Sequence, residues 1–254
     1  MKELVIVKKR FKVLACEILF REFCAAASQS QNIIYVSFLK KALHNLTSAN
    51  MSAYMQKEID AIDHTQYDAI LLGYGLCNNG TLGLHAPIPI VIPKAHDCIT
   101  LFLGSKERYR EYFDANPGAY YHTSGWLERN NIEADMEGTI SQQMGLGMKR
   151  EQIAEQYGEE NVEYLMETLF SLTPNYTKAT FINMGIGTVE TDRELTKQKA
   201  IDSGWEYEEL SGDMGLIHRL LNGEWNENEF LVIRPGQTLR QSYDEHVIST
   251  CENV

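Results

Sequence analysis

The chain has 254 residues, a formal net charge of -12, and hydrophobic residues at 44% of its positions. This composition predicts a globular protein with a substantial core, organised as one elaborated domain or as two intimate halves. The acidic charge excludes a nucleic-acid-binding function, which needs clustered cations, and no apolar stretch of about 18 residues is present to span a membrane.

The predicted location of the protein bears on the chemistry of its cysteines. Residues 1–10 are too few and too charged for a signal peptide, so we expect a cytoplasmic protein. Five cysteines, an odd number, argue against a disulfide framework in that setting. We therefore expect free thiols, metal ligands or nucleophiles.

The first 113 residues alternate apolar strands with helices. Strands are predicted over residues 11–16, 32–38, 68–73 and 88–93, and helices over residues 17–28, 48–62 (with Ser48 as N-cap) and 99–113. This alternation indicates βαβ units and a parallel sheet. The connection between the third and fourth strands is short enough to hold only a helical turn.

The rest of the chain divides into two further parts. Residues 114–178 show no clear strand, and a helix is predicted over residues 149–172, so this part is interpreted as a mostly helical insertion. The α/β pattern then returns, with strands predicted over residues 179–184, 205–210 and 230–233 and helices over residues 190–203 and up to residue 221. The predicted fold is α/β, with two Rossmann-like parallel-sheet halves, residues 1–113 and 179–254, flanking the insertion.

Three cysteines follow strands of the first half. Cys16 ends the first strand, Cys77 lies four residues past the third, and Cys98 lies five residues past the fourth. With strand order 2-1-3-4 these strands are neighbours, and ligands of such sheets bind at the carboxyl ends of the strands. We therefore expect the three thiols to converge. His96 is a fourth candidate ligand, although one residue separates it from Cys98, which in an extended loop directs the two side chains to opposite sides.

Three thiolates suit either zinc or a 4Fe-4S cluster. Zinc with three protein ligands keeps an open position, which is the catalytic arrangement. The sequence contains no CxxC and no HExxH motif, so the signal is positional. A metal-free reactive thiol and a set of small buried hydrophobic residues are the alternatives.

Two residues of the first half are candidates for roles beside the cysteines. Glu17 directly follows Cys16 and could accept a hydrogen bond near the metal, act as a general base, or be a solvated residue of a first helical turn. Gly75 precedes Cys77 in a glycine-rich loop, where a missing side chain lets the backbone approach a ligand closely or make a tight turn.

The second half offers further candidates after its own strands. Gly185 and Gly187 precede a helix, the position at which backbone amides bind anions. Gly212 and Asp213 open the next helix, where Asp213 could bind a ligand, act as a base or, as the position favours, cap the helix. Arg234 follows the last strand and could pair with a carboxylate or phosphate, or be a surface residue.

Several segments resemble one bacterial and archaeal family, DUF1638, whose function is unknown. They are Ala15–Glu17, Leu72–Thr81, Ala95–Leu101, Leu103–Tyr109 and Tyr121–Trp126. The resemblance is close to full length and brings no established activity. It implies a genomic setting beside corrinoid-dependent methyltransferases of the trimethylamine type, so a corrinoid protein or corrinoid methyltransferase is the expected partner. The chain has no Asp-x-His-x-x-Gly stretch and does not resemble the corrinoid carrier itself.

The resulting hypothesis is a zinc–thiolate protein of corrinoid-linked one-carbon metabolism. Its activity would be methyl transfer to or from a thiol or another small-molecule substrate, with Cys16, Cys77, Cys98 and His96 at the metal. Asp213 and the glycine loops of the second half would bind the rest of the substrate across the crevice. The alternatives are an iron–sulfur protein that uses the same cysteines, and a non-catalytic accessory or binding protein for a corrinoid enzyme.

Overall fold

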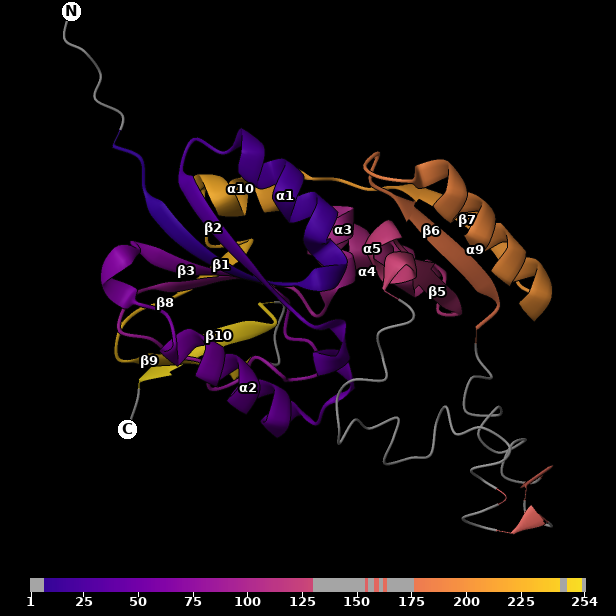
Figure 1. The fold of residues 1–254 in the computed structure, drawn as a ribbon, viewed down its shortest axis with the longest axis horizontal. Coiled ribbons are helices and arrows are strands. Elements are labelled where there is room, and N and C mark those ends of the chain that lie inside the picture. Colours follow the sequence, from indigo (N-terminus) through magenta and orange to yellow (C-terminus); the bar gives the residue numbers. More distant parts are fainter. Residues whose placement is uncertain are drawn as a thin grey trace, which may run out of the picture.

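The computed structural model describes residues 7–129, 154, 158–159, 162–163, 176–242 and 246–252. In this part of the chain, two separate sheets with parallel strands confirm the predicted α/β class (Figure 1). The helix predicted over residues 149–172 falls outside the described residues, apart from isolated positions.

The first sheet has five strands in the order β2-β1-β3-β4-β8. Four of them are parallel, as predicted: β1 (Arg10–Cys16), β2 (Ile33–Leu39), β3 (Ala69–Gly73) and β4 (Ile90–Pro93). Every residue of β3 and β4 is buried, because both faces of the sheet are covered and continuous apolar runs suit that position. This burial explains why β3 and β4 appear in the sequence as uninterrupted hydrophobic stretches.

Helices cover both faces of the first sheet. On one face lie α1 (Phe20–Gln29) and α10 (Gly215–Asn222), which contact each other, and on the other lies α2 (Ser48–Asp60), as Figure 1 shows. Three short 3-10 helices complete the connections, η1 (Glu17–Leu19), η2 (Lys41–Asn45) and η3 (His64–Gln66). Thr47, not the predicted Ser48, caps α2, since its side chain accepts from the Asn50 amide.

The predicted helix over residues 99–113 is two helices. They are α3 (Cys98–Leu103) and α4 (Lys106–Ala115). Gly104 ends α3 with a φ of +79°, a left-handed conformation that terminates a helix, and the Ser105 side chain then caps α4 by accepting from the Arg108 amide at 3.0 Å.

The second sheet is parallel and has the strand order β5-β6-β7. Its strands are β5 (Ala119–His122), β6 (Lys178–Asn183) and β7 (Glu206–Ser211), and its helices are α5 (Ser124–Glu128) and α9 (Val189–Ser203). The expectation that residues 114–178 contain no strand is wrong at β5, a four-residue strand that pairs with β6.

The last predicted strand belongs to the first sheet. β8 (Phe230–Ile233) runs antiparallel beside β4, with Phe230 opposite Pro93 and Ile233 opposite Ile90. The buried face of α10 packs on the first sheet, and β8 then pairs with β4 at the edge of that sheet. An antiparallel pair that was not predicted, β9 (Gln237–Gln241) and β10 (Ile248–Glu252), follows. No helix among the described residues is long and apolar enough to cross a membrane.

Candidate functional site

The candidate site lies where the carboxyl ends of the two sheets meet. The loop after β7 reaches α3, with the Asp213 amide donating to the Phe102 carbonyl at 2.9 Å. After β5, α5 packs on η1 so closely that a Cβ on Gly125 would lie 1.7 Å from the Ile18 carbonyl oxygen. The residues that follow β1 and β4 therefore face the second sheet, which is the crevice expected for ligands of α/β sheets.

Cys16 is the last residue of β1 and is 8% exposed. Burial raises the pKa of its thiol to about 11, and the Tyr74 side chain opposes that shift only weakly. Tyr74 follows β3 directly and is itself buried, so burial raises the pKa of its hydroxyl as well, with further contributions from Cys16 and Cys77. The thiol of Cys16 is therefore neutral in the folded chain at ordinary pH.

Cys77 lies in a left-handed stretch of the loop after β3. Its φ is 47°, and Asn78 and Asn79 follow at 54° and 64°. Left-handed conformations cost about 1 kcal/mol or more for non-glycine residues, so neighbouring bonds must hold this segment in place. The Cys77 amide donates to the His96 carbonyl at 2.8 Å, and the Leu76 amide donates to the Ala95 carbonyl at 2.8 Å.

Gly75 allows the loops after β3 and β4 to approach each other. A Cβ at this position would lie 2.8 Å from the Ala95 carbonyl oxygen and 2.8 Å from the Asp97 amide. Its missing side chain thus brings two protein backbones together, the loop that carries Cys77 and the loop that leads to Cys98.

Cys98 begins α3, and Asp97 before it caps the helix. The Asp97 carboxylate accepts from the Ile99 amide at 2.9 Å and from the Tyr109 hydroxyl at 2.9 Å. Cys98 keeps some exposed surface, yet burial of the thiol raises its pKa well above the ordinary value, and the charges of Asp97, Cys77 and Cys16 raise it further.

The structure thus brings the three predicted cysteines into one neighbourhood. Burial raises the pKa of Cys77 to about 12, and Cys16 adds to that shift, while Cys98 responds to both of the other thiols. In residues 7–129, 176–242 and 246–252, however, no group of three or more His, Cys, Asp or Glu side chains stands in a metal-binding arrangement. The three thiols are therefore close to one another, but they are not arranged to coordinate a metal ion.

His96 and Glu17 lie differently from the thiols. His96 has an exposed side chain and contributes its backbone carbonyl to the site, in line with the opposite directions expected for His96 and Cys98. One oxygen of Glu17 accepts from the Lys41 amide at 2.7 Å, and the other lies 3.7 Å from the Arg129 guanidinium. Glu17 therefore ties η1 to η2 and α5.

A model of the family described as "Protein of unknown function (DUF1638)" matches residues 38–221, well over half of the chain. This chain belongs to the DUF1638 family. No curated protein and no solved structure shows significant similarity to it. The matched residues include Cys77 and Cys98, whereas Cys16 precedes them.

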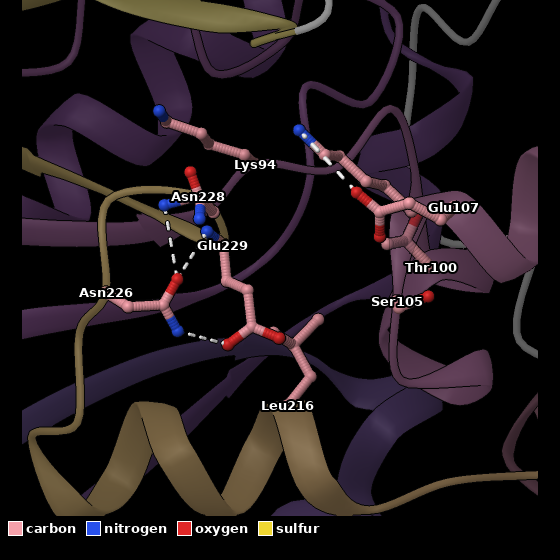
Figure 2. Close-up of a pocket in the computed structure, with 9 residues that line it drawn as sticks. Lys94, Thr100, Ser105, Glu107, Leu216, Asn226, Asn228 and Glu229 are labelled. Atoms are coloured by element: carbon pink, nitrogen blue, oxygen red, sulfur yellow. Dashed lines mark hydrogen bonds and ion pairs between the residues drawn. The ribbon is translucent and has the colours of Figure 1, made fainter.

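A cavity of this DUF1638 protein lies next to α3, and none of the three cysteines lines it. Its volume is about 380 Å³, and it opens between the end of β4, the start of α4 and the loop that precedes β8 (Figure 2). Thr100 contributes to its wall. Cys98 and Thr100 are separated by about 200° around the helix, so they occupy different faces of α3.

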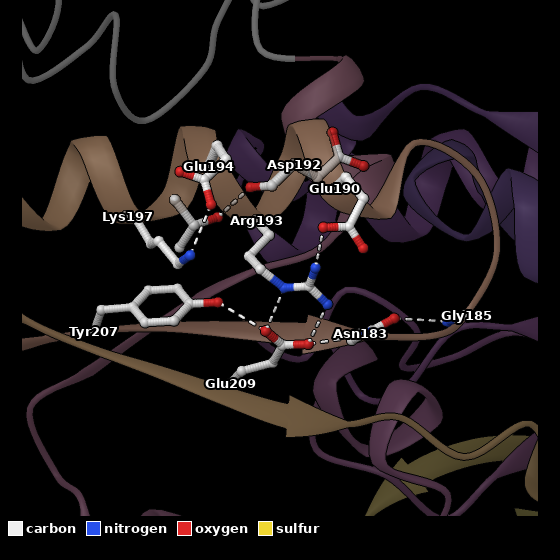
Figure 3. A network of polar contacts seen from close by, with 10 residues as sticks. Asn183, Gly185, Glu190, Asp192, Arg193, Glu194, Lys197, Tyr207 and Glu209 are labelled. Carbon is white, nitrogen blue, oxygen red and sulfur yellow. Dashed lines mark hydrogen bonds and ion pairs between the residues drawn. The ribbon is translucent and has the colours of Figure 1, made fainter.

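The glycine loop after β6 is stabilised internally. The Gly185 amide donates to the Asn183 side chain at 2.8 Å, and Asn183 in turn donates to Glu209 at 2.9 Å (Figure 3). Gly187 packs against the Arg21 side chain. The first turn of α9 carries the acidic residues Glu190 and Asp192, which repel a bound anion. The contacts of this loop in the described residues are with the protein itself, and a ligand-binding role for Gly185 and Gly187 stays a prediction.

Gly212 and Asp213 also have structural contacts. A Cβ on Gly212 would lie 2.0 Å from the Met184 sulfur, and the Asp213 side chain accepts from the Gly215 amide at 2.6 Å at the start of α10. Met214 and not Asp213 is the N-cap of α10, so Asp213 binds the first helical amide from one residue ahead of the cap position. Its exposed side chain nonetheless lies at the crevice, next to Gly104.

Arg234 lies near the amino end of β4, whereas the cysteines follow the carboxyl ends of their strands. It follows Ile233, which pairs with Ile90 at the beginning of β4, because β8 is antiparallel. Arg234 is therefore remote from the carboxyl ends of β1, β3 and β4, and a ligand-binding role for it stays a prediction.

The sequence reasoning missed the aromatic hydroxyls beside the cysteines. Tyr109 donates to Asp97, and the Tyr109 ring contacts the Tyr121 ring at 5.9 Å between centroids. The Tyr121 hydroxyl is buried and has no hydrogen-bond partner among the described residues. The resemblance segments already included Asp97, Tyr109 and Tyr121, but a role near the thiols needs the tertiary arrangement.

Proposed function

We propose that this DUF1638 protein binds a metal ion, zinc, through the thiolates of Cys16, Cys77 and Cys98. The observation that supports the proposal is the convergence of the three thiols at the carboxyl ends of β1, β3 and β4. Ligand sites of α/β sheets lie at this edge.

The protonation of the thiols favours a metal site over a metal-free nucleophile. Burial raises the pKa of Cys16 to about 11 and that of Cys77 to about 12, so without a cation neither is a thiolate at neutral pH. Reactive cysteines lie in electropositive surroundings that lower their pKa. A bound metal ion reverses this situation, because it deprotonates a coordinating thiol outright.

The ligand types suit zinc. Zinc binds sulfur at about 2.3 Å in tetrahedral geometry, and three protein ligands leave its fourth position for a substrate. The exposed side chain of His96 favours three protein ligands over four. A 4Fe-4S cluster on the same three thiols is the alternative, since it also leaves one site open.

Metal coordination would require the side chains of the cysteines to move while the backbone around them stays in place. Coordination requires rotation of cysteine side chains from their present positions, because they do not stand in a metal-binding arrangement. The backbone bonds around Cys77, to His96 and Ala95, hold the segments near one another while the side chains turn. Metal binding would then connect the ends of three neighbouring strands.

The activity proposed for such a centre is methyl transfer to or from a thiol or another small molecule. The metal would hold a substrate thiol deprotonated in its open position, which makes it a nucleophile at neutral pH. The corrinoid protein or methyltransferase as partner remains a prediction from the family resemblance.

Elemental analysis of the whole chain, purified without oxygen, tests the metal site directly. We expect about one zinc per chain in the wild type and its loss in the serine variants of Cys16, Cys77 and Cys98. Cys24→Ser is the matched control, because Cys24 is an exposed thiol of α1 outside the cluster. The control should keep the metal.

A visible spectrum of the same samples separates zinc from iron. Zinc protein is colourless, whereas several irons per chain with a dark colour that oxygen bleaches would assign the 4Fe-4S cluster instead. A wild-type protein that takes up neither metal, also after anaerobic incubation with zinc or with iron and sulfide, would overturn the proposal. Retention of the metal in all three stably folded variants would do the same.

A further inference from the structure

Tyr74 directly follows β3 and lies beside Cys16. In the parallel pair of β1 and β3, Ala15 is opposite Gly73. The same register, continued by one residue, places Cys16 beside Tyr74. Neighbouring strands lie about 4.8 Å apart, and side chains that are opposite each other point to the same face of a sheet. The Tyr74 ring and the Cys16 thiol are therefore directed to the same side.

That side faces away from α1. A Cβ on Gly73 would lie 2.5 Å from the Ala15 Cβ and 2.7 Å from the Phe23 ring, so Gly73 and Ala15 both face α1. Successive residues of a strand point to opposite faces of the sheet. Tyr74 and Cys16, the next residues of the two segments, thus share the face of the sheet that is opposite to α1.

The Tyr74 hydroxyl is a buried polar group without a hydrogen-bond partner among the described residues. The residue is 3% exposed. Buried hydroxyls are paired in most proteins, because an unpaired one loses its bonds to water without replacement. After burial, Cys16 and Cys77 are the groups that most raise the pKa of this hydroxyl, which locates it close to both thiols.

A thiol and a thiolate differ as partners for this hydroxyl. A neutral thiol is a weak acceptor, whereas a hydrogen bond to an ionised acceptor is about twice as strong as one between neutral groups. A metal ion deprotonates the thiol that coordinates it. Coordination of Cys16 would therefore turn the closest neighbour of the unpaired hydroxyl into a strong acceptor.

We propose that the Tyr74 hydroxyl donates a hydrogen bond to the Cys16 thiolate and acts as a positioning residue of the zinc centre. This inference rests on the proposed function, since it needs a thiolate at Cys16. Hydrogen bonds to metal ligands fix the orientation of those ligands. Such a bond also stabilises the thiolate, and a more stable thiolate is a weaker nucleophile. Cys16 would thus remain a ligand, and the nucleophile would be the sulfur of a bound substrate thiol.

Tyr74→Phe tests the hydrogen bond, because it removes the hydroxyl and keeps the ring. In competition with a zinc chelator, the affinity of the whole chain for zinc should fall about 10–100-fold, the usual effect of losing a partner of a metal ligand. The thermal stability of the metal-free variant should be retained or raised, since an unpaired buried hydroxyl is removed. Tyr67→Phe is the matched control, because Tyr67 precedes the amino end of β3, and it should leave the affinity unchanged.

Alkylation by iodoacetamide separates the hydrogen bond from a general loosening of the site. The reagent attaches to sulfur with loss of iodide, so its rate at each cysteine, mapped on peptides by mass spectrometry, reports the nucleophilicity of that sulfur. With zinc in excess, Cys16 of Tyr74→Phe should react several-fold faster than in the wild type, while Cys77 and Cys98 change little.

The outcomes distinguish this inference from the proposed function. An unchanged zinc affinity, an unchanged rate at Cys16, or equal acceleration at all three thiols would overturn the role of Tyr74 and leave the zinc site in place. A wild-type protein that takes up no zinc would overturn the proposed function, and the role of Tyr74 with it.

Discussion

Replacing Glu22 by glutamine should make the protein more stable at neutral pH and remove part of its pH dependence. Glu22 lies on α1, is 0% exposed, and neither of its carboxylate oxygens has a hydrogen-bond partner among the described residues. Burial raises its pKa to about 7, and the nearby charge of Glu128 adds to the shift, while Arg21 and Arg129 oppose it.

The direction of the change in stability depends on whether the folded or the unfolded chain holds the Glu22 proton more tightly. The ordinary pKa of this carboxyl group is 4.5, and the folded value is about 7. Between these values the unfolded chain releases the proton and the folded chain keeps it, so stability falls as the pH rises through this window. At about 1.36 kcal/mol for each unit of pKa, the full loss of folding stability is about 3 kcal/mol, and it is reached above pH 7.

Urea unfolding of both proteins at several pH values between about 5 and 8 measures this difference. The free energy of unfolding of Glu22→Gln, relative to wild type, should rise with pH by about 3 kcal/mol and then level off. Glu111→Gln, at an exposed position of α4, is the matched control and should show a small and constant difference. A Glu22→Gln difference that stays constant over the whole range would refute the reasoning.

Three further substitutions test contacts of the candidate site and of the second sheet. Gly125→Ala should cost about 3 kcal/mol or more, measured by thermal unfolding, because its Cβ would overlap the Ile18 carbonyl. Gly75→Ala should cost about 1–3 kcal/mol and weaken metal uptake, measured by elemental analysis, because it separates the loops after β3 and β4. Arg193 lowers the pKa of Glu209 to about 2, so Arg193→Gln should remove stability that is present above pH 4.5 and lost as the pH falls toward 2. Because Glu209 is partly exposed, about 1 kcal/mol or less is expected in urea unfolding at neutral pH, and no difference in acid.

The sequence was sufficient to predict the sheet that carries the cysteines. Strands β3 and β4 and most of β1 are buried, so they appear in the sequence as short apolar runs, and the helices between β1, β2 and β3 favour parallel neighbours. That reasoning also located Cys16 and Cys98 at the same edge. It depended on strand direction alone, not on any motif.

The direction of β8 could not be read in the same way. Phe230–Ile233 has the composition of any buried strand, and its partner is decided by where α10 docks. The same limit applies to β5, whose four residues pair in parallel with β6 across a long intervening segment. The position of Arg234, at the opposite end of β4 from the cysteines, follows from the direction of β8.

The directions of side chains were also only partly predictable from the sequence. The spacing of His96 and Cys98 showed that the two side chains diverge, but not which of them faces the other thiols. The break after Leu103 depends on a left-handed glycine, Gly104, which composition alone did not distinguish from a glycine inside a longer helix. Tyr109, Asp97 and Tyr121 lie on different segments of the chain, so no local sequence pattern predicts the contacts between them.

The second sheet provides none of the three cysteines, yet it supports two of the segments that carry them. Cys16 is followed by η1, whose Ile18 carbonyl contacts Gly125 of α5. Cys98 begins α3, whose Phe102 carbonyl accepts from the loop after β7. A ligand that draws the thiols together must therefore move these contacts or fit within them. The geometry of the candidate centre thus depends on the contacts between the two sheets as well as on the strands that carry its thiols. For that reason a residue such as Gly125, on the second sheet's side of this contact, affects the position of Cys16.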